Sequence, residues 1–228
     1  MPAFGGFPPE TISFLRALRA NNRRDWFDAH RADYEAYWLA PAKAFVVAAG
    51  QQLAELAPQI RAEPRVLGSI LRINRDTRFS RDPSPYKDHL DVWFWEGDRR
   101  RAVSGFFARL TPEFLGVGAG CHGLDPERLT RFRQAVVDAA SGAELAGIAQ
   151  GLEAAGYQPA GATLKRPPAD FADGGPAGRF LVHKALFVHR DEPADKRLHT
   201  AAVLATCMRH WRALAPLHRW LTDNVQAS

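Results

Sequence analysis

"LDVWFWEGDRRRAVSGFFARLTPEFLGVGAG", residues 90–120, decides the fold of this chain. Three runs rich in branched and aromatic residues, at 90–95, 102–110 and 114–120, are separated only by "EGDRRR" and "TPE". Such runs between turn-forming residues predict β-strands. The connections are too short for a crossover helix, so we expect the three strands to pair antiparallel.

Helical patterns lie on the N-terminal side of these strands. Apolar residues at helical spacing predict one helix over residues 9–20 and a second over roughly 23–38. Pro41 suits the first turn of a third helix, which Pro58 follows. Between this helical block and residue 90, "RVLGSILRI" at 65–73 is rich in branched apolar residues and predicts a further strand.

Helical patterns also follow the strands. Asp125 and Pro126 are typical of an N-cap and a first helical position, and Ser141 with Glu144 predicts a capping box for the next helix. Gly156 is expected to end that helix.

The last third of the chain predicts one more strand and one more helix. "RFLVHKALFVH", residues 179–189, is apolar on both faces and predicts a strand in the centre of the sheet. Residues 195–226 have a helical apolar stripe, which Pro216 is expected to break or restart.

The order of the elements predicts an α+β fold. We expect an antiparallel or mixed sheet of about five strands, packed with an N-terminal helical block and C-terminal helices. The 228 residues suffice for a single domain, in which residues 1–60 are helical, 65–120 hold strands and a charged loop, and 121–228 hold helices and a closing strand.

Composition limits the class of protein. The chain is 46% hydrophobic and 24% charged, which is typical of a folded globular protein. It has two cysteines, no secretory leader pattern and no run of about twenty apolar residues. We therefore expect a cytoplasmic protein with no membrane segment and no disulfide framework. The formal net charge is +5, and residues 65–101 carry nine basic and six acidic side chains.

The segment "RINRDTRFSRDPSPYKDH", residues 72–89, concentrates this charge. Arginines stand at every third position from 72 to 81, a spacing that alternates faces on a strand but allows convergence in a loop bent by prolines. Arginine forks match phosphate and carboxylate oxygens. The hypothesis is a basic pocket for a phosphate-bearing or other anionic ligand, a small molecule or nucleic-acid phosphate. Its predicted ligand-binding residues are Arg72, Arg75, Arg78, Arg81, Lys87, His89, Lys165 and Lys184.

Two other interpretations stay open. Asp76, Asp82 and Asp88 each neighbour a basic residue, so they could pair with the arginines and order a long loop in a non-catalytic interaction or scaffold protein. The same aspartates, with Asp91 and His89, could instead hold a divalent cation in a metal-dependent phosphoesterase, although the arginines would compete for them. The favoured hypothesis, a basic pocket for an anionic ligand, includes no metal and no cofactor.

Chemistry, if the pocket performs any, would use His89 or Tyr86 as the acid–base group, by side-chain type alone. Lys184 alternates with apolar residues of its predicted strand, so we expect its ammonium group on an otherwise apolar face, where it would need an anionic partner.

Four blocks together resemble one family. They are "NNRRDWFDAHRADYEAY" at 21–37, the loop at 72–89, "GVGAG" with "LDPERLTRFR" at 116–133, and "LKRPP" at 164–168. This chain resembles the DUF2461 family over roughly residues 4 to 225. The resemblance implies no established activity, substrate or cofactor. The segment after "LKRPP" lacks the Asp-His-Pro that the family often has there, so the resemblance implies no histidine role in that second loop.

Overall fold

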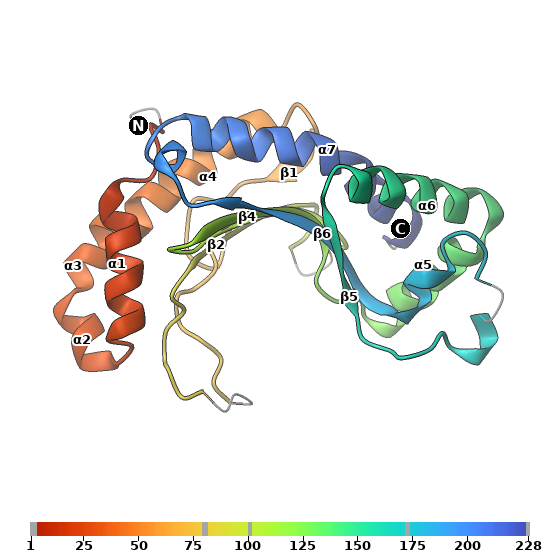
Figure 1. The fold of residues 1–228 in the computed structure, drawn as a ribbon, viewed down its shortest axis with the longest axis horizontal. Helices are drawn as coiled ribbons and strands as arrows, with labels where there is room; N and C mark the ends of the chain where they lie inside the picture. Colours follow the sequence, from red (N-terminus) through yellow and green to blue (C-terminus); the bar gives the residue numbers. More distant parts are fainter. Residues whose placement is uncertain (1–3, 79–81, 100–101, 172–173, 227–228) are drawn as a thin grey trace. The chain divides into compact units, whose positions relative to one another are not determined.

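A computed structural model of the chain describes residues 4–78, 82–99, 102–171 and 174–226. It has an α+β fold whose six strands form one antiparallel sheet in the order β1-β2-β3-β4-β6-β5 (Figure 1). The predicted fold class is therefore confirmed, with one strand more than expected. The strands are β1 (Ile60–Arg61), β2 (Leu90–Glu96), β3 (Gly105–Leu110), β4 (Phe114–Cys121), β5 (Gln158–Ala162) and β6 (His183–Pro193).

The chain divides into two compact units, each built from several segments. The first comprises Met1–Phe94, Phe107–Gly116 and Asp191–Arg209, and the second comprises Trp95–Phe106, Val117–Arg190 and His210–Ser228. The expectation that residues 1–228 form a single domain stays a prediction. The charged loop and the N-terminal helices belong to the first unit.

The N-terminal helical block of the first unit begins with α1 (Pro9–Ala20), as predicted. The predicted second helix is divided into α2 (Arg24–Ala29), the single turn α3 (Arg31–Asp33) and a π-helical segment, Tyr34–Leu39. That segment continues directly into α4 (Ala40–Leu53), so Pro41 lies in the first turn of α4, as expected.

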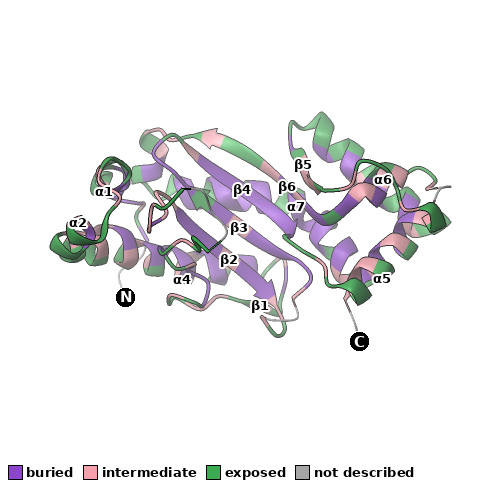
Figure 2. Ribbon diagram, turned by 90° about the horizontal axis from the view of Figure 1, so that it is seen from below, coloured by how far each residue is buried: buried purple, intermediate pink, exposed green. Residues whose placement is uncertain are grey.

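The face of β2 toward α4 is the apolar core of this unit. Leu90, Val92 and Phe94 alternate along the strand and are each at most 3% exposed. In Figure 1, α4 lies on one side of β2, and the loop that precedes β2 extends from the other side. Figure 2 views β2 and β3 from that second side, where no helix of the described part of this unit lies in front of them. The polar side chains of Asp91 in β2 and Arg109 in β3 lie on this second face, where they contact each other.

The second unit confirms most of the predicted helix ends. Asp125 caps α5 (Pro126–Val137) by accepting a bond of 2.9 Å from the backbone N–H of Arg128. Helix α6 (Ala139–Ala154) starts earlier than predicted, because Asp138 rather than Ser141 is its N-cap. Gly156 follows the end of α6 with φ +82°, a conformation that favours glycine.

The closing elements differ from prediction in their limits. Strand β6 lies between β4 and the edge strand β5, so it is an interior strand but not a central one. It begins at His183, because Gly178–Val182 form a 3₁₀-helix. The predicted C-terminal helix is a short 3₁₀ segment, Lys196–His199, followed by α7 (Ala202–Val225). Helix α7 continues through Pro216, so the expected break is wrong. The remaining 3₁₀ turn is Ala169–Phe171.

The strand predicted at residues 65–73 is wrong. This segment makes only isolated bridges, Val66 with Ile70 and Ile70 with Val92, because the chain turns back on itself at Leu67 and Gly68. Leu67 has φ +65° and a side chain that is 60% exposed. A branched apolar residue in the left-handed region is strained, and here its side chain gains little from burial.

Replacing Leu67 by Asn should therefore stabilise the protein. Asparagine tolerates the left-handed conformation, so we expect Leu67→Asn to raise the free energy of unfolding by about 0.5–1 kcal/mol in urea unfolding experiments. Leu67→Ala is the matched control, since it removes the same exposed side chain but keeps the strain. An asparagine variant no more stable than the alanine variant would contradict the assignment.

Candidate functional site

The segment before β2 is held in place by backbone hydrogen bonds to the segment that enters the charged loop. Arg75 N–H donates to Pro85 O at 2.9 Å, and Lys87 N–H donates to Ile73 O at 2.7 Å. Further along, Leu71 N–H donates to Asp91 O at 3.0 Å. The two ends of the loop thus run side by side (Figure 1), which fixes the positions of the side chains from residue 86 to 91.

The N-terminal helical block clamps the same segment. The side chain of Asn22 accepts from Tyr86 N–H at 3.0 Å and donates to Tyr86 O at 2.9 Å, as a neighbouring strand would. The rings of Phe27 and Tyr86 stack with their centroids 4.2 Å apart. Tyr86 is buried, and this burial raises the pKa of its hydroxyl. The structure therefore places Tyr86, one of the two candidate acid–base residues, against the helical block.

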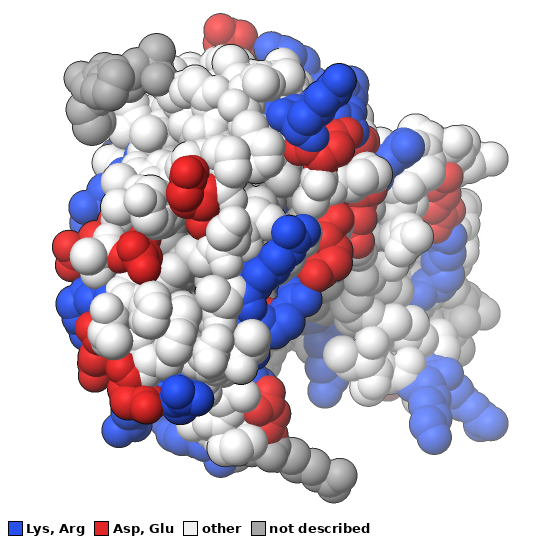
Figure 3. Space-filling view, turned by 60° about the vertical axis from the view of Figure 1, so that its left-hand side comes forward, with Lys and Arg blue, Asp and Glu red and all other residues white. Residues whose placement is uncertain are grey.

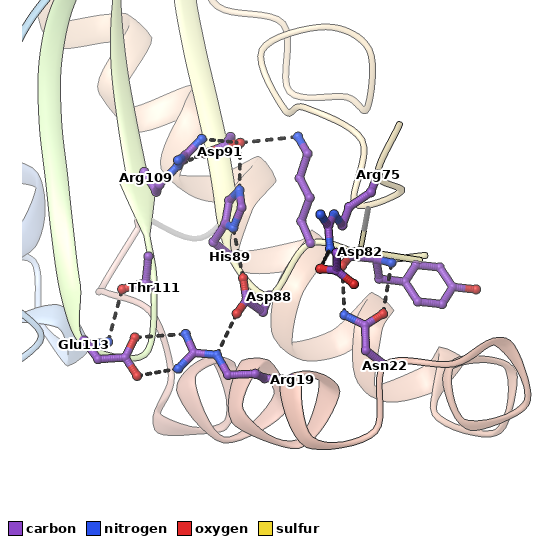
Figure 4. A network of polar contacts seen from close by, with 12 residues as sticks. Arg19, Asn22, Arg75, Asp82, Asp88, His89, Asp91, Arg109, Thr111 and Glu113 are labelled. Carbon is purple, nitrogen blue, oxygen red and sulfur yellow. Dashed lines mark hydrogen bonds and ion pairs between the residues drawn. The ribbon is translucent and has the colours of Figure 1, made fainter. Parts of the chain in front are cut away.

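Asp91 is the centre of the charged site. It is a buried carboxylate on the face of β2 opposite Val92, and it is 7% exposed. Arg109 of β3 donates from Nε to Oδ1 at 2.6 Å and from Nη2 to Oδ2 at 3.2 Å. Lys87 Nζ and His89 Nε2 each lie 3.3 Å from the same Oδ2. We call Lys87, His89, Asp91 and Arg109 the Asp91 cluster (Figure 4).

The surrounding cations keep Asp91 ionised. Burial alone would raise the pKa of the carboxyl, but hydrogen bonds from His89 and Arg109 outweigh that effect and hold the pKa well below its usual range. A buried charge without such partners would be costly. The cluster thus retains a full negative charge on Asp91 and two permanent positive charges, on Lys87 and Arg109.

A second chain of contacts extends from His89 to α1. His89 Nδ1 lies 3.2 Å from Asp88 Oδ1, and Arg19 Nε donates to Asp88 Oδ2 at 2.6 Å. Arg19 also makes a bidentate pair with Glu113, at 2.7 and 2.9 Å. We call Arg19, Asp88 and Glu113 the Arg19 chain. Both ring nitrogens of His89 therefore face carboxylates, and only the doubly protonated ring can donate to both.

The loop arginines form separate pairs. Arg75 is bonded to Asp82, and Arg78 donates to Asp76 at 2.7 and 3.0 Å. The hydrogen bonds from Arg78 lower the pKa of Asp76 to about 2. Exposed Arg72 adds a weaker electrostatic effect on the same carboxyl. Arg75 and Arg78 thus engage carboxylates of their own loop, as the structural interpretation predicted. Their part in binding a ligand stays a prediction.

The remaining predicted residues fall outside this arrangement. Arg81 lies outside the described residues. Lys165 and Lys184 belong to the second unit, and both are exposed. Lys184 alternates in β6 with the buried residues Leu186 and Val188, as expected, but its own side chain is exposed to solvent and so needs no anionic partner. Of the eight predicted residues, the structure brings Lys87 and His89 into one cluster.

Sequence reasoning missed Arg109 and the Arg19 chain as parts of the site. Arg109 is a single basic residue within the apolar strand "GFFARL", and its alternation with Phe107 was a signal that both point to one face. The pairing of Arg19 with Glu113 spans 94 positions, and no local pattern marks it.

The metal interpretation finds no support in the grouping of side chains. Among residues 4–78, 82–99, 102–171 and 174–226, no three His, Cys, Asp or Glu side chains are grouped as metal ligands would be. Each candidate carboxylate is instead bonded to an arginine, as expected if arginines compete with a metal ion for it. These carboxylates are Asp76, Asp82, Asp88 and Asp91.

The comparison with known families agrees with this description. A family model described as "Conserved hypothetical protein (DUF2461)" matches residues 10–220. The chain therefore belongs to the DUF2461 family, as the sequence blocks indicated. No curated protein and no solved structure matches it. Across the described helices, none combines the length and apolar character that a membrane crossing requires.

Asp91→Asn should destabilise the protein strongly at neutral pH. It removes the counter-charge from Lys87 and from the half-exposed Arg109, at a cost of about 2 kcal/mol, which is less than for a fully buried pair because water screens Arg109. Because the folded pKa of Asp91 is depressed, the contribution of its charge is full above the unfolded pKa of about 3.9 and is lost as the pH falls below it. Urea unfolding should therefore show that the free energy of unfolding of the variant is below that of the wild type at pH 7. This difference in free energy should be smaller at pH 3.

Asp76→Asn is the control for this experiment. Its carboxylate is also paired with an arginine but is exposed, so water screens the pair. We expect a far smaller loss of stability at pH 7. An equal loss in the two variants would show that burial of the Asp91 cluster contributes nothing.

Proposed function

We propose that the protein binds a phosphate-bearing or other anionic ligand at the Asp91 cluster, with Lys87 and Arg109 as its main donors. The observation that carries the proposal is the excess of cations: three basic side chains surround one buried carboxylate. This moves the predicted pocket from the tip of the charged loop to its base, where the loop joins β2.

Donor groups beyond those bound to Asp91 support the proposal. Arg109 uses Nε and Nη2 on Asp91, and its side chain is 49% exposed. Its Nη1 group has no protein partner in the part of the chain that the structure describes. Lys87 places its single ammonium bond on Asp91 and has two further protons. Both residues therefore offer charged donors to an anion that approaches from the open face.

Asp91 would act as a positioning residue in this site. Its carboxylate fixes Lys87 and Arg109 before a ligand arrives, so binding costs less side-chain entropy than it would with unrestrained lysine and arginine chains. His89 is the acid–base candidate of the site. It lies between Asp88 and Asp91, with Nδ1 3.2 Å from Asp88 Oδ1 and Nε2 3.3 Å from Asp91 Oδ2.

The local charge pattern favours a small anion over a long polyanion. Acidic residues of the same unit lie nearby in the chain and in space, including Glu113 of the Arg19 chain. Figure 3 shows Lys and Arg interspersed with Asp and Glu on the face it displays, rather than a continuous basic surface. Nucleic-acid backbones favour extended basic surfaces, whereas one phosphate needs two or three convergent donors.

Titration with inorganic phosphate tests the proposal directly. Calorimetry should detect binding to the wild-type protein, and Lys87→Gln or Arg109→Gln should weaken it about tenfold or more, as expected when a charged hydrogen bond is lost. Arg179→Gln is the matched control. Arg179 is also 49% exposed and paired bidentately with a carboxylate, that of Glu153, but it belongs to the second unit.

Circular dichroism should first establish that each variant is folded. If folded Lys87→Gln and Arg109→Gln proteins bind phosphate as the wild type does, the proposed site is wrong. No phosphate binding by the wild type would contradict the anion-binding function itself.

A scaffold role for the charged loop is the second candidate, and the pairs Arg75–Asp82 and Arg78–Asp76 favour it. Asp82 also accepts from Ser84 N–H at 2.9 Å, so one carboxylate joins two points of the loop. Such local bonds restrain a long loop.

Limited proteolysis tests this second role. Asp82→Asn should increase trypsin cleavage within residues 74–89 several-fold while the melting temperature stays close to that of the wild type, because exposed pairs contribute little to global stability. Glu127→Gln, which removes a pair with Arg131 on α5, should leave cleavage of this loop unchanged. Unaltered loop cleavage in Asp82→Asn would count against the scaffold role.

A further inference from the structure

Two aromatic residues adjoin the Asp91 cluster on the same face of the sheet. Successive side chains of a strand alternate between faces, so Trp93 shares the face of Asp91, and Phe107 shares the face of Arg109. Strands β2 and β3 are antiparallel, and Asp91 contacts Arg109. Moving two residues forward in β2 and two back in β3 therefore leads in the same direction, to Trp93 and Phe107.

Next to the buried Asp91, the aromatic residues on its face are less buried than the residues on the opposite face. On the α4 side, Val92, Phe94, Phe106 and Ala108 are each at most 4% exposed. Trp93 and Phe107, on the other side, remain partly exposed. The backbone of Trp93 is fixed by its N–H bond of 2.8 Å to Ser69 O. The face with the excess cations thus also presents aromatic surface on a rigid strand.

Cationic donors beside an aromatic surface suit a ligand that joins an anion to a flat ring. Phosphate oxygens would bind Lys87 and Arg109, and an aromatic base would stack on Trp93. Resting on the proposed function, we propose that the ligand of the Asp91 cluster is a free mononucleotide or a close chemical analogue, a small phosphate ester that carries a planar heteroaromatic ring. The interspersed acidic groups described above disfavour a strand of nucleic acid at the same place.

Four probes separate the parts of this ligand: adenosine 5′-monophosphate, ribose 5-phosphate, adenosine and inorganic phosphate. Calorimetry with the full chain should show that the mononucleotide binds about tenfold more tightly than ribose 5-phosphate, the gain expected from stacking one base. Adenosine alone should bind weakly, because it lacks the charged group.

Variants of the aromatic residues then show which side chain causes the tighter binding of the mononucleotide. Trp93→Leu should remove the preference for the mononucleotide and leave the affinity for ribose 5-phosphate unchanged, whereas Trp93→Phe should retain part of the preference. Trp26→Leu is the control, since Trp26 is a partly exposed tryptophan that stacks on His30 in the helical block. If Trp93→Leu does not fold, Phe107→Leu offers the same comparison with a smaller change of volume.

The outcomes distinguish the two proposals. If both phosphate esters bind with equal affinity, the anion site stands and the aromatic assignment is overturned. A mononucleotide preference that survives in folded Trp93→Leu and Phe107→Leu would also overturn it. If none of the phosphate compounds binds, the proposed function fails together with this inference.

Discussion

Burial of the Asp91 carboxylate is the constraint on which the first unit depends. An ionised group in this position is tolerated only when charged donors occupy its oxygens. Here those donors come from three places in the chain: the base of the charged loop, the residue just before β2 and the end of β3. The requirement to compensate one charge therefore fixes how the loop enters the sheet, in addition to the backbone bonds that pair residues 71–75 with 85–91.

The same requirement connects the sheet to the N-terminal helices. Asp88 continues the network from His89 to Arg19 of α1, and Asn22 holds the backbone of Tyr86 two residues before Asp88. Two of the blocks that carry the family resemblance, at 21–37 and 72–89, thus meet in one contact region, where Phe27 stacks on Tyr86. Their joint presence in the sequence has a physical reason: one block positions the backbone of the other.

Local sequence patterns correctly predicted the elements that depend on interactions between residues close together in the chain. Strands β2, β3 and β4 follow from apolar runs between tight turns, and α1 and α5 follow from periodicity and from the Asp125 cap. The strand predicted at 65–73 failed because apolar composition does not reveal a left-handed turn at Leu67. The pairs of loop aspartates with arginines were foreseeable from their short separation. The Asp91 cluster was not, because Arg109 and Lys87 meet only after β2 and β3 pair, and composition alone drew attention to the more numerous loop arginines.

The contrast between the loop arginines and the Asp91 cluster is the reason for which we propose an anion site at the base of the loop rather than at its arginines. Arg78 is highly exposed and bonds an aspartate two residues away, so its position depends on a pair that water screens. Lys87 and Arg109 are held by a carboxylate that is itself fixed in a strand, and their contacts lie in a less polar environment where each charged bond is stronger. A carboxylate that neutralises only part of the surrounding positive charge both orders the donors and leaves an attraction for one more anion. For this reason we expect Lys87 and Arg109, which the sheet holds in place, to bind an anion more tightly than the more numerous arginines of the loop.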